Sequence, residues 1–351
     1  MFCVLAVFGL LATACPSEPT DPPPPTVPPE QEDGPAEGYK DEVSALPDVV
    51  LDDDLCPARP NPVIYTANEF IFTGDPDELE RKQLVFEEIA VSGDVTYYLV
   101  QGSLEEEEFL QNEDAFRQHY FWMSPIHRGH PVDTPEDPDG DVYEPASDWG
   151  ESLGGSVAII DAIPDGSDIA EHGNFIIGML ARLGTPSELF KVETLPGTTD
   201  SIFFREADLI RAVNEISPDQ FSAVNLSLGT YGCPDHKPGA LNRILAGLGI
   251  DIVASAGNDG TGQETYPAAE FIAVGSINKS GELSCFSNYG PWVDYWVVGE
   301  EVLGDIGGAD KTWSGTSFAA PQVAAQIDAG IVATATAPAV VSDPNPEYEC
   351  S

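Results

Sequence analysis

Residues 313–321 read Trp-Ser-Gly-Thr-Ser-Phe-Ala-Ala-Pro, and they lead into the small, apolar run 322–329. Small residues around a central serine let the backbone turn tightly, so this stretch predicts a helix that begins at the serine. The amide dipoles at the start of a helix favour developing negative charge. Ser317 is therefore the candidate nucleophile.

A serine needs partners to act as a nucleophile, because its hydroxyl stays protonated near neutral pH. It requires a base, a group that orients the base, and a donor for the oxyanion. The chain offers one candidate for each. Asp161 follows the apolar run 156–160, His172 opens the segment His-Gly-Asn-Phe-Ile-Ile-Gly, and Asn258 lies in Ala-Ser-Ala-Gly-Asn-Asp-Gly after the apolar run 250–254.

These four segments, in the order Asp, His, Asn, Ser, resemble the subtilisin-like serine proteases. Three further segments add to the resemblance. Residues 224–229, Val-Asn-Leu-Ser-Leu-Gly, are similar to the strand that pairs with the substrate backbone, and residues 284–290 are similar to the loop before the nucleophile. Residues 266–268, Tyr-Pro-Ala, resemble the turn near the specificity pocket, where a cis proline is typical.

The resemblance, which covers roughly residues 153–335, implies a serine endopeptidase that hydrolyses peptide bonds through an acyl-enzyme. Ser317 would attack the scissile carbonyl, His172 would take its proton, Asp161 would orient the imidazole, and Asn258 would stabilise the oxyanion. A polypeptide substrate would add a strand along Ser227, Leu228 and Gly229. The wall of the first specificity pocket would be formed by Ser255, Ala256 and Gly257.

One departure from the family pattern leaves a second function open. Asp161 and His172 are only 11 residues apart, and the family's calcium-site loop between them is missing. No cofactor is therefore expected, and calcium has no support beyond the resemblance. The alternative is a catalytically impaired, subtilisin-like peptide-binding protein at the cell surface, in which the triad is misassembled.

Apolar runs and helical periodicity alternate through residues 151–340. This alternation predicts an α/β fold with a mostly parallel sheet, helices on both of its faces, and the site at the carboxyl ends of the strands. The expected strands are 156–160, 189–195, 223–228, 250–255 and 271–276, and the expected helices are 172–183, 206–216, 241–248 and 317–334.

Residues 56–130 precede this domain and predict a small α+β module. Residues 69–72 and 95–100 read as strands, and Asp75 reads as the N-cap of a helix that carries Leu79, Phe86 and Ile89 at helical spacing. A strand-helix-strand module ahead of such a domain resembles the family's propeptide, a folding aid and inhibitor. A plain N-terminal extension is the alternative.

Two segments invite a metal site, and neither completes one. Residues 117–130 hold three histidines but no cysteine or closely spaced carboxylate, so we interpret them as a packed linker. Residues 137–141 alternate carboxylates as a calcium loop does, but Val142 stands where such a loop needs glycine. We interpret 131–150 as an acidic linker and expect no metal site.

Residues 1–15 predict a signal peptide with a short apolar core, although the first basic residue is Lys40. Residues 11–15, Leu-Ala-Thr-Ala-Cys, resemble a bacterial lipoprotein cleavage box, which would leave Cys15 lipidated at the mature N-terminus. An ordinary cleavage site is the alternative. Residues 16–55 are acidic and rich in proline, which predicts a disordered spacer. The protein is thus expected outside the cytoplasm, as an envelope lipoprotein or an extracellular protein.

The whole chain of 351 residues has 14 Lys and Arg against 60 Asp and Glu, a net charge of −46. Such a charge argues against nucleic acid as a partner, and it also argues against attraction to an anionic membrane. We expect a monomer whose membrane contact is made through the Cys15 lipid, with residues 341–351 as a tail. Four cysteines would remain for disulfides, with three possible pairings: Cys56, Cys233, Cys285 and Cys350.

Overall fold

The structure is a computed structural model. It describes residues 46–331 except 57–58, 60, 106–107, 109–110, 124–126, 132–141, 146–154, 164–170 and 196–200, and it describes only the backbone of 127–131. The predicted signal peptide with Cys15, most of the predicted spacer, most of the acidic linker and the C-terminal tail lie outside the described residues. The last part of the predicted spacer, residues 46–55, is described, and the prediction of disorder is wrong there, because Val49–Asp52 form a strand that pairs with Val63–Phe72.

A six-stranded sheet forms the centre of the molecule, in the order β15-β14-β12-β10-β7-β8. Every neighbouring pair in it is parallel. The carboxyl ends of its strands therefore meet at one edge. The strands are β7 (Val157–Ala162), β8 (Ser187–Val192), β10 (Ala223–Leu226), β12 (Asp251–Ser255), β14 (Ile272–Ile277) and β15 (Tyr295–Val298).

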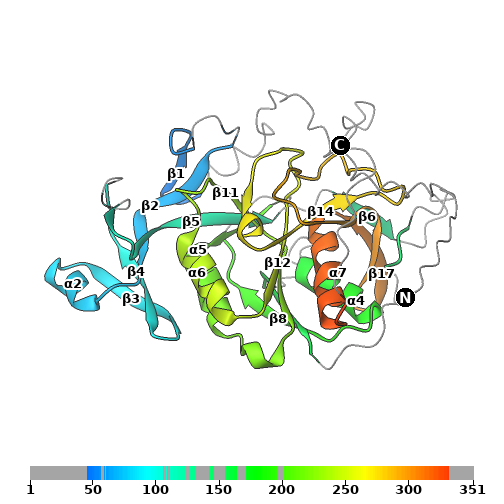
Figure 1. Ribbon diagram of the computed structural model, residues 1–351, viewed down its shortest axis with the longest axis horizontal. Coiled ribbons are helices and arrows are strands. Elements are labelled where there is room, and N and C mark those ends of the chain that lie inside the picture. The colour runs from blue at the N-terminus through cyan, green and yellow to red at the C-terminus, as the bar shows by residue number, and fades with distance from the viewer. Residues whose placement is uncertain are drawn as a thin grey trace, which may run out of the picture.

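Helices cover both faces of this sheet (Figure 1). Ala158 and Ile160 of β7 face the core formed with α5 (Glu206–Asn214) and α6 (Gly239–Leu248). Val157 and Ile159 face the opposite core, formed with α4 (His172–Arg182) and α7 (Thr316–Asp328). Successive side chains of a strand point to opposite faces, so a strand that is apolar throughout is buried on both sides.

A second sheet is antiparallel and lies beside the first, in the order β3-β4-β2-β5-β9, with β1 paired to β2. Its long strand β5 runs from the N-terminal part to the centre of the molecule (Figure 1). The elements are β1 (Val49–Asp52), β2 (Val63–Phe72), α2 (Pro76–Arg81), β3 (Val85–Ser92), β4 (Val95–Gln101), β5 (Ala115–Met123) and β9 (Ile202–Arg205).

Two small sheets complete the described part. Strands β16 (Val302–Ile306), β17 (Ala309–Ser314) and β6 (His127–Pro131) form one, and β11 (Thr230–Tyr231) pairs with β13 (Thr265–Tyr266) in the other. The Tyr266–Pro267 peptide bond is cis, as the resemblance led us to expect. Single turns of 3₁₀ helix lie at Pro218–Gln220 and Ala268–Glu270.

The predicted α/β class is confirmed, although the molecule as a whole contains mixed sheets. The nine strands and helices expected in residues 151–340 are present with shifted ends, while β9 and β15–β17 were not foreseen. Residues 56–130 do contain strands and a helix, but they do not stand apart, since β5 pairs with β9 of the following domain.

Two expectations about the N-terminal part, residues 56–130, are wrong. The helix after Asp75 ends at Arg81, so Phe86 and Ile89 lie in strand β3. Gln83 has a φ of 57°, and a backbone bond from Leu84 to the carbonyl of Leu79 closes the helix end at that point. The spacing of the apolar residues fitted a helix only because this left-handed turn was not recognised.

The predicted linker 117–130 is also wrong, because these residues contribute to strands β5 and β6. His119 is fully packed there, and its Nδ1 lies 3.1 Å from the buried carboxylate of Glu206. The consecutive aromatic residues Tyr120, Phe121 and Trp122 explain the strand, since each face of it meets an apolar core.

One disulfide joins Cys56 to Cys233, which resolves part of the open pairing. Cys285 is disulfide-bonded as well, and its pairing lies outside the described residues. Among the described helices, none is both long and apolar enough to cross a bilayer.

Phe175 of α4 tests the packing that fixes α4 against α7. Its ring stacks on Trp313 with centroids 4.8 Å apart and meets Phe318 edge-on at 4.9 Å. Phe175→Ala should lower the free energy of unfolding by about 3–5 kcal/mol, because the buried ring leaves a cavity. Val85→Ala is the control, since Val85 is 70% exposed, and it should change stability by less than about 0.5 kcal/mol. Urea unfolding measures both, and equal effects would contradict this account.

Candidate active site

The centre of the site is a buried pair between Asp161 and His172. Asp161 is the last residue but one of β7, and His172 is the first residue of α4. Their side chains are 1% and 0% exposed, and His172 Nδ1 lies 2.8 Å from Asp161 Oδ2. The backbone N–H of Ala162 donates to the other carboxylate oxygen at 2.8 Å. The carboxylate is therefore held in place, and it fixes both the position and the tautomer of the imidazole.

Gly173 allows this approach of helix to strand. A Cβ atom at position 173 would lie 2.9 Å from the Cβ of Asp161 and 3.0 Å from Leu189 Cδ1. Real Cβ contacts are longer than that, so any other residue would push α4 away from β7. The glycine after the histidine thus sets the distance between base and carboxylate.

Ser317 is the second residue of α7, and it faces the same region. Its side chain is buried, and its hydroxyl donates to the carbonyl oxygen of Ser227 at 3.5 Å. The hydroxyl of Ser227 in turn donates to the carbonyl of Ser317 at 2.9 Å. These bonds tie the beginning of α7 to the chain that follows β10.

The second ring nitrogen of His172, Nε2, lacks within the described part of the chain the hydrogen bond that a buried polar atom needs. Nε2 is buried and has no hydrogen-bond partner among the described residues. An unpaired buried polar atom costs about 1–3 kcal/mol. The ring of Phe318, the residue after Ser317, lies 5.3 Å from the imidazole ring, centroid to centroid. The imidazole therefore stands beside the start of α7, the helix whose second residue is Ser317.

Apolar rings enclose the imidazole. The ring centroids of Trp313 and His172 are 6.2 Å apart, and Phe175, which lies in the same helix α4 as His172, stacks on Trp313. All of these rings are buried. Water is excluded from the carboxylate side of the histidine, which strengthens its interaction with Asp161.

Asn258 lies at the start of the same helix. Its Oδ1 accepts from the backbone N–H of Thr316 at 2.9 Å and from the Thr316 hydroxyl at 2.8 Å. An oxygen that accepts from a backbone N–H fixes the orientation of the whole side-chain amide. The first N–H groups of a helix have no acceptor within it, so the Ser317 N–H is a second donor at this end. The predicted oxyanion donor is thus placed beside the predicted nucleophile.

The predicted substrate-binding strand is occupied by the chain itself. Gly229 exchanges both backbone hydrogen bonds with Trp122 of β5, at 2.9 and 3.0 Å. On its other side β5 pairs with β9, from Tyr120↔Arg205 to Met123↔Ile202. An extended segment therefore lies antiparallel between β9 and the residues that follow β10.

The predicted pocket wall, residues 255–257, follows β12 and is held by polar side chains. Asn288 donates to the carbonyl of Ala256 at 3.0 Å, and its Oδ1 accepts from the N–H groups of Asp259 and Thr261. The Thr265 hydroxyl donates to the same Ala256 carbonyl at 2.8 Å. Gly257 has a φ of 103°, which a residue with a side chain rarely adopts.

Three features of the site escaped the sequence analysis. The role of Thr316 in holding Asn258, the strand β9, and the placement of Trp122 depend on contacts between distant segments. Only β9 carried a signal, the short apolar run 202–204 before a helix. Within the described residues, no group of three or more His, Cys, Asp or Glu side chains could hold a metal ion. Residues 164–170, where the family's calcium loop was judged missing, and residues 137–141 lie outside them.

The chain is similar to proteins of a known family. The model of the subtilase family matches residues 190–333. The thermophilic serine proteinase of Bacillus sp. (strain AK1) is 29% identical over 180 residues, which cover 47% of this chain and 43% of that protein. The major intracellular serine protease of Bacillus subtilis (strain 168) is 31% identical over 177 residues, which cover 45% and 54%. The chain thus spans about half the length of these relatives.

Among solved structures, the chain is similar to that of the prenylagaramide maturation protease PagA. It is 21% identical and covers 51% of this chain and 75% of its own, with a TM-score of 0.42.

The close approach at Gly173 can be tested without reference to function. Gly173→Ala should lower the free energy of unfolding by about 1–3 kcal/mol, because the new methyl group collides with Asp161 and Leu189. Gly247→Ala is the matched helical control. There a Cβ would meet the tip of the Ser92 side chain at 3.0 Å, and removing a glycine from a helix gains up to about 1 kcal/mol. Urea midpoints that move in the same direction for both variants would show that the packing at Gly173 is not tight.

Proposed function

Because the chain belongs to the subtilase family, we propose that it is a serine endopeptidase that hydrolyses peptide bonds through an acyl-enzyme. The observation that carries the proposal is the buried Asp161–His172 contact of 2.8 Å beside the helix that begins with Thr316 and Ser317. A base held by a buried carboxylate next to a serine at a helix N-terminus is the arrangement that activates a hydroxyl.

In the proposed reaction the Ser317 hydroxyl turns from the Ser227 carbonyl toward His172 Nε2. Nε2 takes the proton as Oγ attacks the scissile carbonyl, and it returns that proton to the leaving amine. Asp161 accepts from Nδ1 throughout, so it stabilises the imidazolium that forms. Water then attacks the acyl-enzyme by the same route in reverse, with His172 again as the base.

The tetrahedral oxyanion would be stabilised by two donors at the start of α7. One is the Ser317 N–H, and the other is the side-chain amide of Asn258. The amide is oriented before substrate arrives, because Thr316 binds its oxygen twice. Donors that need no rearrangement are the ones that lower a barrier most.

The substrate would be an extended, locally unfolded polypeptide. Trp122 and Gly229 already exchange the backbone hydrogen bonds that an added strand would make, which supports binding of substrate along Ser227, Leu228 and Gly229. Residues 255–257 would line the first specificity pocket. The chain matches about half of the length of its relatives, so a polypeptide substrate for the whole protein is proposed and is not taken from them.

The N-terminal part would act as the inhibitor of the same molecule. Strand β5 lies where substrate would bind, between β9 and Gly229. As long as it remains there, a second polypeptide has no edge with which to pair. This supports the propeptide-like role of residues 56–130 over that of a plain extension.

Export and anchoring complete the proposal. The signal-like residues 1–15 and the cleavage box that ends at Cys15 support an exported protein, tethered by lipid through the acidic spacer 16–55. The Cys56–Cys233 disulfide agrees with an oxidising compartment. Calcium and other cofactors have no part in it.

One observation favours the alternative, a catalytically impaired peptide-binding protein. The Ser317 hydroxyl donates to Ser227, and His172 Nε2 has no partner among the described residues. If that arrangement persisted when a peptide binds, the chain would hold peptides without cleaving them. The two functions differ in whether Ser317 becomes reactive.

A fluorophosphonate probe tests this directly. Purified protein is cut beyond β5, either by itself or by an added protease at a recognition sequence inserted between Glu136 and Asp137. The Cys56–Cys233 disulfide is reduced with dithiothreitol, the N-terminal piece is removed by gel filtration, and the probe is then added. Wild type should be labelled at Ser317, because the probe reacts only with an activated serine, whereas Ser317→Ala should neither label nor process itself. Ser280→Ala changes an exposed loop serine and should behave as wild type. Folded wild-type protein that stays unlabelled after β5 has been removed would favour the peptide binder.

Asn258→Ala separates binding from turnover. Loss of one oxyanion donor should lower kcat by about 10²- to 10³-fold with little change in KM, because the amide acts on the transition state. Steady-state hydrolysis of a peptide substrate by the cut and reduced protein, freed of its N-terminal piece, gives both constants. A kcat equal to that of wild type would show that Asn258 is not an oxyanion donor.

A further inference from the structure

Within the described residues, a disulfide links the N-terminal part to the catalytic part in addition to the chain itself. Cys56 follows β1 and is buried, and Cys233 lies two residues beyond β11 and is partly exposed. Gly229, which pairs with Trp122, is only four residues before Cys233. The end of β5 lies in the space between β9 and Gly229, which we call the channel. The disulfide thus joins the N-terminal part to the segment that borders this channel.

The inner contacts of β5 are apolar and run along the same segment. The ring of Trp122 lies 5.0 Å from that of Tyr231, between centroids, within a cluster that includes Ile64 and Phe203. Phe121 and Met123 point the other way, into the core shared with Leu228. Burial of this kind holds the end of β5 in the channel.

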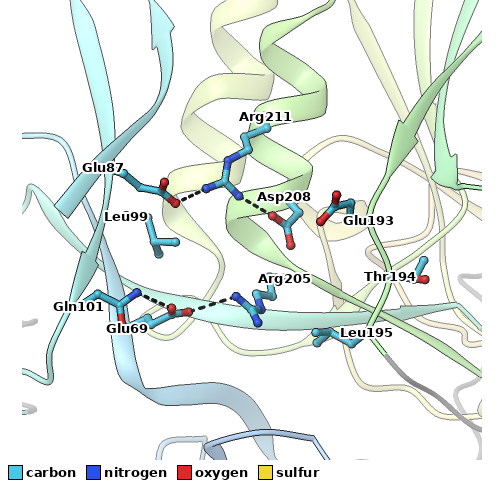
Figure 2. A pocket seen from close by; sticks show the side chains of 10 residues that line it. All are labelled: Glu69, Glu87, Leu99, Gln101, Glu193, Thr194, Leu195, Arg205, Asp208 and Arg211. Carbon is cyan, nitrogen blue, oxygen red and sulfur yellow. Dashed lines mark hydrogen bonds and ion pairs between the residues drawn. The ribbon is translucent and has the colours of Figure 1, made fainter. Parts of the chain in front are cut away.

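The contacts of the N-terminal sheet with the following domain include an apolar part, in which Ile89, Tyr97 and Leu99 belong to the same core as α5. They also include a polar part that surrounds a cavity of about 300 Å³ (Figure 2). Arg211 of α5 bridges Glu87 of β3 and Asp208 of its own helix, and Arg205 lies 3.8 Å from Glu69 of β2. Burial raises the pKa of Asp208, against the opposing effect of Arg211. Half-exposed ion pairs contribute little and are screened by salt. This part of the interface would not keep the two parts together by itself.

We propose that the Cys56–Cys233 disulfide retains the N-terminal part as a tethered inhibitor after the chain has been cut between β5 and β7, and that a dithiol releases it. The proposal rests on the proposed function, since the cut is assigned to the protein's own Ser317. Hydrolysis adds water across one peptide bond and separates the polypeptide there, but the disulfide leaves both pieces in one molecule.

The tether matters because it makes re-binding intramolecular. A segment held by a short connection has an effective concentration on the order of millimolar, whatever the dilution of the protein. The end of β5 would therefore return to the channel each time it left. A separate fragment would instead be lost on dilution, and the channel would open to substrate.

The release step is thiol–disulfide exchange with a dithiol reductant. One thiolate attacks Sγ of Cys233, the more exposed partner, and Cys56 leaves as a thiolate that takes up a proton. The second thiol of the reductant then attacks the mixed disulfide, which frees Cys233 as a thiol and closes the reductant into its own disulfide. Two electrons and two protons pass to the protein.

The test separates retention from activity. A recognition sequence for an added, sequence-specific protease is inserted between Glu136 and Asp137 of the full chain carrying Ser317→Ala, and the N-terminal piece is labelled with a fluorophore. After the cut, the protein is diluted to nanomolar concentration and passed over a gel-filtration column. The label should co-elute with the catalytic part in oxidising buffer, and at least tenfold more of it should separate after dithiothreitol.

Two variants decide the cause of the release. The double variant Cys56→Ser with Cys233→Ser should lose the label without reductant. Cys285→Ser removes a different disulfide and should retain the label as the parent does. Full retention in the double variant, or release from Cys285→Ser without reductant, would overturn the proposal.

The same cut protein with Ser317 intact gives the regulatory readout. Peptide hydrolysis should rise at least tenfold on addition of dithiothreitol, and the double variant should be active without it. If the label is released as expected but the freed catalytic part hydrolyses nothing, the proposed function fails while the tether stands. If the freed part and the tethered form hydrolyse peptide equally, the inhibitory role of the tether is refuted.

Discussion

The distance between β7 and α4 is the constraint on which the site depends. Asp161 is fixed by the parallel sheet, and His172 is fixed by the first turn of a helix that packs on it, so their contact of 2.8 Å measures how closely the two layers approach. Gly173 permits that approach, and the stack of Phe175 on Trp313 holds it from the other side. The chemistry of the imidazole is therefore a property of the core and not of a loop.

Strand β5 connects the two halves of the molecule, because it pairs with strands of both. It is a strand of the N-terminal sheet where it pairs with β2, and it is an added strand of the catalytic part where it pairs with β9 and Gly229. The same residues complete the N-terminal sheet and pair with segments of the following domain. If β5 inhibits the site, as proposed above, it needs no separate binding surface, because the sheet continues into it.

Nine strands and helices of residues 151–340 could be predicted from the sequence, because their signals are local. Apolar runs gave the buried parallel strands, and the small residues around Ser317 gave the start of α7. The N-terminal half was predicted less well. The spacing of Phe86 and Ile89 fitted a helix, because the left-handed turn at Gln83 was not recognised. Residues 117–123 gave no indication that the last four of them pair with residues 202–205. Pairings across such separations are set by tertiary packing, which no short pattern encodes.

The alternation of side chains along β5 also fixes its alignment. Tyr120 and Trp122 face one apolar cluster, while Phe121 and Met123 face another, and both clusters are closed. Sliding the strand by one position would exchange the two sets, and each would then meet a cavity shaped for the other. The segment therefore has one alignment, and the alternation of its side chains between the two clusters sets it.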